Sequence, residues 1–303
     1  MARNFLQITD LKRSEAWNML TRAKEIKASN WRSTLLNGKT IILLFEKAST
    51  RTRISFEVAI RALGGNVLFM TNKESQLGRN EPLRDTARVL SRYVQGVVVR
   101  TFAQESLEEL ASVGTIPVIN ALTDLHHPCQ VMSDMLTIFE NTPDLPSLKV
   151  AWVGDGNNMA NSWLHAAMYF PFTLHLAVPK GYEPDSGILQ HARESGANVV
   201  LTHDPKEAVS EAHYVNTDVW ASMGQEDAAN ERREIFAPFQ VNSRLLALAH
   251  PECKVLHCLP AKRGEEITDN VLEGESSLVW DQAENRLHMQ KALLEWVYDE
   301  HHV

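Results

Sequence analysis

The sequence predicts an α/β fold with two doubly wound parallel-sheet domains joined by helices. Short apolar runs such as "TIILLF" alternate with segments whose apolar residues recur at helical spacing, which is typical of parallel sheets covered by helices on both faces. The alternation occurs twice, and the stretch "NTPDLPS" (141–147), rich in proline and polar residues, separates the two runs. With 303 residues, the chain has room for two domains of ordinary size.

The first run predicts a domain over residues 1–140. Asp10 is the expected N-cap of an initial helix, whose apolar stripe extends from Leu11 to Ile26. The other expected elements are strands at 40–45, 66–70, 96–100 and 116–121, and helices at 51–63, 83–93, 106–112 and 128–140.

The second run predicts a domain over residues 148–282. Its expected elements are a helix at 159–169 and strands at 149–154, 173–178, 198–202, 212–217 and 254–259. A last helix over 282–300 is long enough to return to the first half. We therefore expect residues 283–303 to pack on the first domain.

Composition excludes several classes of protein. Hydrophobic residues make up 44% and the net charge is −8, which suits a globular protein and leaves no basic excess for general nucleic-acid binding. The three cysteines form no C-x-x-C pair, so we expect a reducing compartment and neither a disulfide framework nor a structural zinc site. An apolar signal core and apolar runs of membrane-spanning length are both missing, and a cytoplasmic protein that does not enter membranes is expected.

Unusual polar residues follow the predicted strands. In open parallel sheets, ligands bind beyond the carboxyl ends of the strands. The motifs found there are "EKASTRTR", Arg100 with Thr101, "LTDLHHPCQ", "GDGNNMANS", "DVWASMG" and "CLPAKRG". We therefore expect the functional site to be assembled from these strand-to-helix junctions.

The stretch "KASTRTR" (47–53) predicts an anion site. Ser49 and Thr50 occupy the N-cap region of the following helix, where unpaired N–H groups and the helix dipole favour an anion. The Arg51 guanidinium and the Thr52 hydroxyl add donors for a phosphate, although the P-loop spacing is absent. The alternative is a capped helix with a solvated basic first turn, which fits poorly because cations oppose the dipole there.

Three other motifs permit both a functional and a structural interpretation. In "HHPCQ", Pro128 suits the first helical position, so His127 and Gln130 can hold a carbonyl and an amino group, or His127 can simply cap the helix. Cys258 in "HCLP" can serve a site or be an ordinary buried cysteine. "GDGNN" suggests a dinucleotide, but Met159 stands where the third glycine is required, which argues against NAD.

Taken together, the motifs resemble the aspartate/ornithine carbamoyltransferase family. The segments "FEKASTRTRISFE", "SQLGRNEPLRDTARVLSRY", "HHPCQ", "VGDGNNMANS", "DVWASMG" and "HCLPAKRGEEIT" occur in the family's order. The resemblance implies transfer of a carbamoyl group from carbamoyl phosphate to L-ornithine, giving L-citrulline and phosphate, a step of arginine biosynthesis. It also implies an active site in the cleft between the domains, catalytic homotrimers, and no metal or cofactor. Lys47 and the "SMG" loop favour the ornithine branch over the aspartate branch.

The resemblance also implies residue roles. The implied carbamoyl-phosphate ligands are Ser49, Thr50, Arg51, Thr52, Gln76, Arg100, His127, Gln130, Cys258, Leu259 and Arg286. Gln76 would come from a neighbouring subunit. The implied ornithine ligands are Asn158, Asp218, Ser222 and Met223. The catalytic set would be Arg51, Arg100, His127, Asp218 and Cys258.

The residue chemistry agrees with these roles, and alternatives remain. Arginine, hydroxyl and imidazole donors suit a transition state in which charge grows on oxygen. A substrate amine must first lose a proton, and Asp218 with Cys258 is suited to orient it. A sibling transferase acting on N-acetylornithine, N-succinylornithine or putrescine is one alternative. A catalytically silent regulatory paralogue is another, although none of the implied site positions is substituted.

Overall fold

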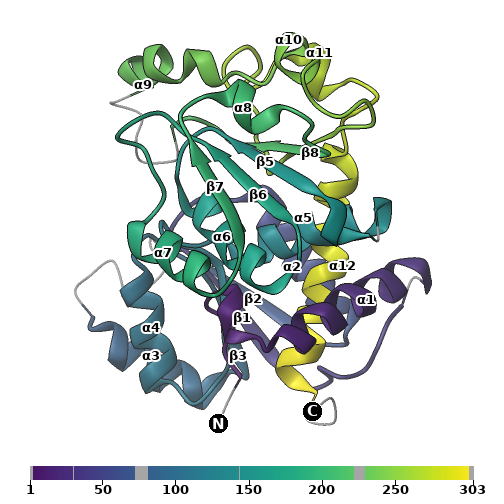
Figure 1. The fold of residues 1–303 in the computed structure, drawn as a ribbon. Coiled ribbons are helices and arrows are strands. Elements are labelled where there is room, and N and C mark those ends of the chain that lie inside the picture. The colour runs from purple at the N-terminus through teal and green to yellow at the C-terminus, as the bar shows by residue number, and fades with distance from the viewer. Residues whose placement is uncertain (1–2, 30, 72–80, 143, 222–228, 300–303) are drawn as a thin grey trace. The chain divides into compact units, whose positions relative to one another are not determined.

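A computed structural model describes residues 3–29, 31–71, 81–142, 144–221 and 229–299 of the chain. The contacts divide the chain into unit 1, Met1–Leu136 with Glu284–Val303, and unit 2, Thr137–Ala283. Each unit contains a parallel sheet interleaved with helices (Figure 1), which confirms the predicted fold class. The expected ligands Gln76, Ser222 and Met223 lie outside the described residues.

Unit 1 contains a four-stranded sheet in the order β2-β1-β3-β4. Its strands are β1 (Thr40–Phe45), β2 (Asn66–Thr71), β3 (Gly96–Arg100) and β4 (Val118–Leu122). Its helices are η1 (Ile8–Asp10), α1 (Arg13–Ser29), α2 (Thr50–Ala62), α3 (Leu83–Tyr93) and α4 (Gln104–Val113), and α5 (Pro128–Asn141) begins in it. Phe45 pairs with Arg100, and Arg100 pairs with Leu122. The carboxyl ends of β1, β3 and β4 are therefore neighbours.

Unit 2 contains a five-stranded sheet in the order β7-β6-β5-β8-β9. Its strands are β5 (Lys149–Val153), β6 (Thr173–Ala177), β7 (Asn198–Thr202), β8 (Tyr214–Thr217) and β9 (Lys254–His257). Its helices are η3 (Leu145–Ser147), α6 (Asn158–Tyr169), α7 (Ser186–Glu194), α8 (Pro205–Val209), α9 (Ala229–Phe236), η5 (Ala237–Phe239), α10 (Ser243–Leu246) and α11 (Asp269–Leu272). Val153 pairs with Thr217, which pairs with His257, so β5, β8 and β9 also end side by side.

The last helix, α12 (Val279–Tyr298), contacts unit 1 from Glu284 onward. The Arg22 guanidinium of α1 donates two hydrogen bonds to the Glu295 carboxylate, at 2.7 and 2.9 Å. Lys27 Nζ donates to Asn285 Oδ1 at 2.8 Å, and Tyr298 Oη donates to the carbonyl of Gln95 at 3.0 Å. These contacts hold Arg286, which lies one residue after Asn285, at a defined place in unit 1.

Several predicted element limits differ from the structure; the strands expected to begin at 116 and 212, for instance, begin at Val118 and Tyr214. Two further differences change the role of a residue. Asp10 does not cap α1; it belongs to η1, where its Oδ2 accepts the N–H groups of Leu6 at 2.6 Å and Gln7 at 3.1 Å. The strand predicted over 254–259 ends at His257. Leu259 has a φ of 58°, which a strand residue cannot adopt.

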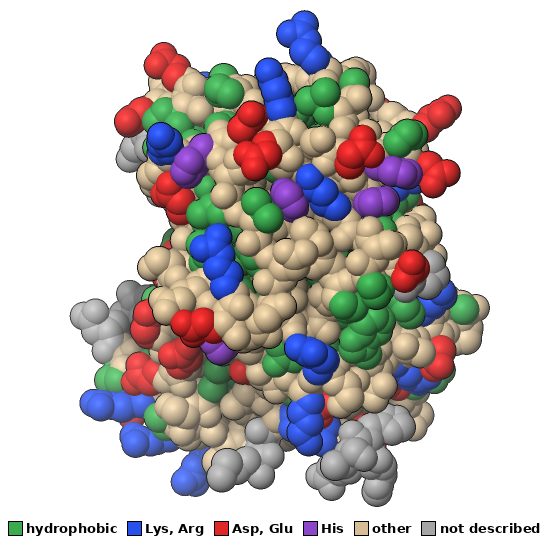
Figure 2. All heavy atoms as spheres, in the orientation of Figure 1, with side chains coloured by type: hydrophobic (Ala, Val, Ile, Leu, Met, Phe, Trp, Pro, Cys, Tyr) green, Lys and Arg blue, Asp and Glu red, His purple; other side chains and the backbone are tan. Residues whose placement is uncertain are grey.

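On the face that Figure 2 shows, basic and acidic side chains are interspersed. Among the described helices, none combines the length and apolarity needed to cross a bilayer.

A glycine in "GDGNN" is explained by packing. Gly156 N–H donates to the carbonyl of Tyr182 at 2.9 Å, so two backbone segments lie against each other. A Cβ at Gly156 would lie 2.3 Å from the backbone carbon of Glu183 and the backbone nitrogen of Pro184. Met159 at the third position of the motif is buried. Backbone approach therefore accounts for this glycine without a dinucleotide.

We predict that Gly156→Ala destabilises the protein by about 1–3 kcal/mol, because the added methyl group overpacks rigid backbone. Urea unfolding measures the change. Gly187→Ala is the matched control, since its Cβ would meet only the Asp185 side chain, at 3.2 Å, and a change within about 0.5 kcal/mol is expected. Equal stability of the two variants would show that the 182–184 backbone yields without cost.

Candidate active site

The N-terminus of α2 is built to receive an anion. Ser49 has extended backbone angles, and its Oγ accepts the N–H of Thr52 at 3.3 Å, which confirms the predicted N-cap. The first turn contains Thr50, Arg51 and Thr52 and no acidic residue. The helix dipole and the remaining first-turn N–H groups therefore present positive potential that no side chain of this turn neutralises.

The three cations of "KASTRTR" have different partners. The Lys47 ammonium pairs with Asp124 and lies 4.2 Å from the centroid of the Phe102 ring. The Arg53 guanidinium lies 3.7 Å from the centroid of the Phe69 ring. Arg51 Nε, in contrast, is buried without a hydrogen-bond partner among the described residues. A buried donor in this state is available to a ligand.

Arg286 and Arg100 complete a basic cluster around His127. Arg286 Nη2 donates to Thr52 Oγ1 at 2.7 Å, and both groups are buried, so α12 meets the first turn of α2 here. Burial lowers the pKa of His127 well below its usual value, and the nearby positive charges of Arg286 and Arg100 lower it further. At neutral pH the imidazole is therefore uncharged, with one N–H to donate and one nitrogen to accept.

Gln130 supplies an acceptor one turn further along α5. Its Nε2 donates to Asp134 Oδ1 at 2.8 Å, which fixes the orientation of the amide. Its Oε1 is then left buried without a hydrogen-bond partner among the described residues. The neighbouring Cys129 is structural, since burial raises the pKa of its thiol to about 12. Unit 1 thus combines donors for an anion with an acceptor for an amino group.

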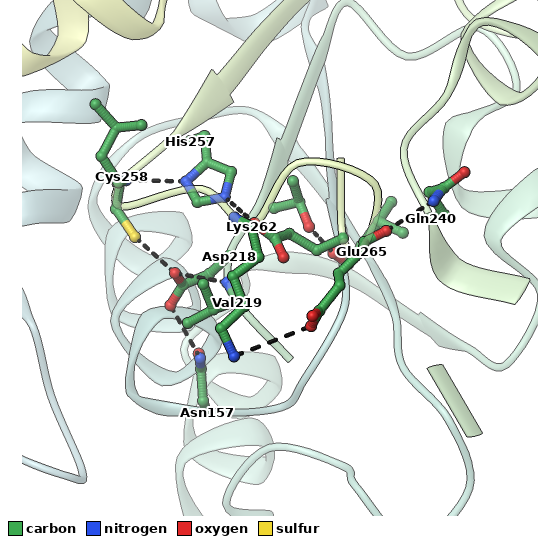
Figure 3. A network of polar contacts seen from close by, with 12 residues as sticks. Asn157, Asp218, Val219, Gln240, His257, Cys258, Lys262 and Glu265 are labelled. Carbon is green, nitrogen blue, oxygen red and sulfur yellow. Dashed lines mark hydrogen bonds and ion pairs between the residues drawn. The ribbon is translucent and has the colours of Figure 1, made fainter. Parts of the chain in front are cut away.

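In unit 2, the polar residues at the ends of β5, β8 and β9 converge on Asp218 (Figure 3). Asp218 Oδ1 accepts hydrogen bonds from Cys258 Sγ at 3.0 Å and from the N–H of Val219 at 2.8 Å. Its Oδ2 accepts from Asn157 Nδ2 at 3.3 Å. Asn158, the residue predicted from the sequence, is the first residue of α6. This arrangement holds a carboxylate and a thiol together where a substrate amine can be oriented.

Sequence reasoning missed Asn157, which precedes the predicted residue Asn158 and contacts the predicted residue Asp218. Its Oδ1 accepts the N–H of Met159 at 2.9 Å, so it is the N-cap of α6, while its Nδ2 contacts Asp218. The preference of asparagine for N-caps was the signal that singles out the first Asn of "NN".

A buried ion pair was also missed. Arg232 of α9 pairs with Asp155 and donates to the carbonyl of Trp220, and its guanidinium lies 4.7 Å from the centroid of the Tyr182 ring. Burial raises the pKa of Asp155 to about 6, although Arg232 opposes the shift. The pair joins the loop after β5 to helix α9, across 77 residues of sequence. A contact between residues so far apart cannot be predicted from local sequence patterns.

One group of side chains has the composition of a metal site. Single ligand atoms of Asp218, His257 and Cys258 lie within 4.8 Å of one another. However, His257 Nδ1 accepts the N–H of Leu259 at 2.9 Å, and His257 Nε2 lies 2.9 Å from Glu266 Oε1. Both ring nitrogens are therefore engaged, and a cation would find only the carboxylate and the thiol.

Two family models match the chain. Residues 3–140 match the carbamoyl-P binding domain of aspartate/ornithine carbamoyltransferases, and residues 147–297 match their Asp/Orn binding domain. The chain is 63% identical over 299 residues to an ornithine carbamoyltransferase from Oleidesulfovibrio alaskensis, covering 99% of this chain and 100% of that one.

Solved structures agree with the sequence relatives. The ornithine carbamoyltransferase from Pyrococcus furiosus is similar with a TM-score of 0.94 and 47% identity, covering 99% of this chain and 98% of the other. The enzyme of the same name from Thermus thermophilus gives a TM-score of 0.91 and 43% identity, covering 99% and 100%. The chain belongs to the aspartate/ornithine carbamoyltransferase family.

Proposed function

We propose that the protein is an ornithine carbamoyltransferase, which transfers the carbamoyl group of carbamoyl phosphate to the side-chain amine of L-ornithine. The products are L-citrulline and phosphate, as in arginine biosynthesis. The main structural support is the Arg51 guanidinium at a helix N-terminus, next to Thr52 and its partner Arg286, where Nε is buried and has no hydrogen-bond partner among the described residues. The relatives above are named for this activity.

The two substrates are assigned to different parts of the chain. Residues 1–140, with 283–303 packed on them, form the carbamoyl-phosphate domain, and residues 148–282 form the ornithine domain. The limits of the two matching family models support the boundary between residues 140 and 147, and the grouping of Glu284–Val303 with unit 1 by contacts supports the assignment of the last helix. The transferred carbamoyl group must reach the amine, so the reaction requires the two domains to bring their substrates together.

Carbamoyl phosphate is held by donors of unit 1 in this proposal. Ser49, Thr50, Arg51 and Thr52 bind the phosphate at the start of α2, where fixed N–H groups add to the guanidinium. Arg100, His127 and Arg286 stabilise the charge that develops on the carbonyl oxygen and the leaving phosphate. Gln130 Oε1 accepts the carbamoyl N–H, which is consistent with its lack of a partner among the described residues.

Ornithine is held by unit 2. Asp218 attracts the side-chain ammonium, and its bond to Cys258 places a second acceptor beside it. Asn158, Ser222 and Met223 bind the remainder of the amino acid, and Leu259 lies beside the reacting centre. The amine, with a pKa of roughly 10 in water, loses its proton with help from Asp218 and Cys258. It then attacks the carbonyl carbon, and phosphate leaves; no metal or cofactor takes part.

Assembly and location are further parts of the proposal. Ile54 and Val58, one turn apart on α2, and Leu68 on the edge strand β2 are 55, 44 and 53% exposed. An apolar face on unit 1 supports contact with another copy of the chain, and we assign it to a homotrimer. No disulfide joins the described cysteines, which supports a reducing compartment, the cytoplasm.

Citrulline formation tests the proposed activity directly. The purified protein should form citrulline from carbamoyl phosphate and ornithine, and should prefer ornithine to N-acetylornithine, N-succinylornithine and putrescine in a substrate panel.

Arg51→Lys should lose activity on the order of 100-fold, because an ammonium cannot replace the forked donor. Arg53→Lys is the control and should stay within a few-fold of wild type, since Arg53 stacks on Phe69. Equal activity of the two variants contradicts the phosphate role.

The lowered pKa of His127 predicts a pH-dependent stability. Below about pH 6.5 the unfolded chain binds a proton at this residue that the folded protein does not, so folding becomes less stable as the pH falls. Between pH 6.5 and 5.5 the loss from this group is about 1 kcal/mol. Urea unfolding should show that His127→Gln removes this share of the pH dependence, whereas His191→Gln on the exposed surface of α7 does not. An unchanged slope in His127→Gln would mean that His127 is protonated when folded.

Hybrid trimers test whether active sites are shared between subunits. Arg51→Ala and Gln76→Ala chains should each be nearly inactive alone, because each lacks one phosphate ligand. Mixed trimers should regain part of the activity, since one site combines an intact Arg51 with an intact Gln76 from its neighbour. Activity is measured on trimers whose composition is verified by native mass spectrometry, with remixed Arg51→Ala chains as the control. No recovery in verified hybrids rules out a shared site.

A further inference from the structure

A buried histidine–glutamate pair lies behind the turn that contains Cys258 and Leu259. His257 and Glu266 have side chains that are 0% exposed. The turn between them is short, and its first residue, Cys258, contacts Asp218 (Figure 3). Removing ionisable side chains from water costs free energy, so a fully buried pair of this kind must be stabilised by hydrogen bonds.

The hydrogen bonds fix the tautomer of His257. The N–H of Leu259 can only donate, so Nδ1 of the imidazole must accept it, over 2.9 Å. The ring proton is then on Nε2, which donates to Glu266 Oε1 at 2.9 Å. A ring protonated on both nitrogens would direct a second N–H at that of Leu259, so only the neutral form fits both bonds.

Glu266 connects the histidine to the far end of the same turn. Its Oε1 also accepts the N–H of Lys262 at 2.6 Å. The backbone of Glu266 is anchored separately, because its carbonyl accepts the N–H of Val241 at 2.8 Å. The turn 258–262 is thus held at both ends by one buried relay, which runs from Leu259 N–H through the His257 ring and the Glu266 carboxyl to Lys262 N–H.

The relay holds a backbone conformation that a leucine does not favour. Leu259 has a φ of 58°, in the left-handed region that non-glycine residues rarely occupy. Such a conformation persists only where the surroundings determine it. The hydrogen bond from Leu259 N–H to the His257 ring helps to hold this backbone conformation. The adjacent Cys258 Sγ then lies 3.0 Å from Asp218 Oδ1.

We propose that His257 and Glu266 are positioning residues, which set the Cys258–Leu259 turn so that the Asp218–Cys258 pair can orient the ornithine amine. The inference rests on the proposed function. Neither residue touches a substrate in this account; both act through the backbone of the turn.

Paired substitutions separate positioning from mere packing. His257→Asn keeps an acceptor for Leu259 N–H, because an asparagine oxygen readily accepts the N–H two residues on. His257→Gln keeps a donor that can extend to Glu266 but loses that acceptor. Glu266→Gln keeps an oxygen that can accept both N–H groups, whereas Glu266→Leu removes it at similar size.

Steady-state kinetics give the first readout. His257→Gln and Glu266→Leu should lower kcat/KM for ornithine on the order of 10- to 100-fold, as loss of a supporting hydrogen-bond partner does elsewhere. His257→Asn and Glu266→Gln should recover most of this loss. Carbamoyl-phosphate affinity, measured by calorimetry, should change by no more than a few-fold in all four, because the donors of unit 1 hold most of that substrate. Arg263→Gln is the control, since Arg263 lies in the same loop and its guanidinium pairs with Asp269 and Glu273 at the surface.

The alkylation rate of Cys258 gives a readout that does not need activity. Peptide mass spectrometry after iodoacetamide treatment should show that this rate changes several-fold in His257→Gln and Glu266→Leu and stays near wild type in the two conservative variants.

Wild-type kinetics and alkylation in all four variants overturn the proposal. Equal losses of stability, carbamoyl-phosphate binding and ornithine turnover in all four also overturn it. If the wild type makes no citrulline, the proposed function fails, while the alkylation pattern still decides whether the relay positions Cys258.

Discussion

Parallel pairing of the strands is the constraint on which both halves of the candidate site depend. In a parallel sheet every strand ends at the same edge, so residues that follow different strands become neighbours without being close in sequence. In unit 1 the strands that precede the basic motifs, β1, β3 and β4, are adjacent, and in unit 2 the same is true of β5, β8 and β9. Each polar cluster is a consequence of strand order.

The two clusters differ in charge in the way that two different substrates require. In unit 1, burial keeps His127 neutral, with a further contribution from the positive charges of Arg286 and Arg100, and Arg286 also contacts Thr52, the residue after Arg51. A dianionic phosphate would find its counter-charges there already in place, which reduces the reorganisation needed at the moment of reaction. Unit 2 presents Asp218 with its oxygens bonded to Cys258 and Asn157, a setting suited to an ammonium that must give up a proton.

Much of each cluster consists of groups that do not face a ligand. Lys47 pairs with Asp124 and lies over the Phe102 ring, and Arg53 lies over the Phe69 ring. Arg232 pairs with Asp155. Each of these contacts joins two different elements or loops of one unit, so together they fix the relative positions of the neighbouring polar groups. Positioning within a fraction of an ångström has a large effect on rate, which is why such supporting contacts belong to the mechanism as much as to stability.

The sequence by itself determined most strands and helices, and it indicated the carboxyl ends of the strands as the place of the candidate site. Periodicity gave β1 at 40–45 and α3 at 83–93, and the hydroxyl preference of N-caps gave Ser49, because these features depend on residues a few positions apart. Tertiary structure alone decided which cation of "KASTRTR" is paired with a carboxylate inside the protein, since Asp124 lies 77 residues from Lys47. It also decided that Arg286 meets Thr52 across 234 residues, and that β9 stops at His257. Local patterns cannot predict such contacts, because the partner of a buried polar group is set by how the chain folds back on itself.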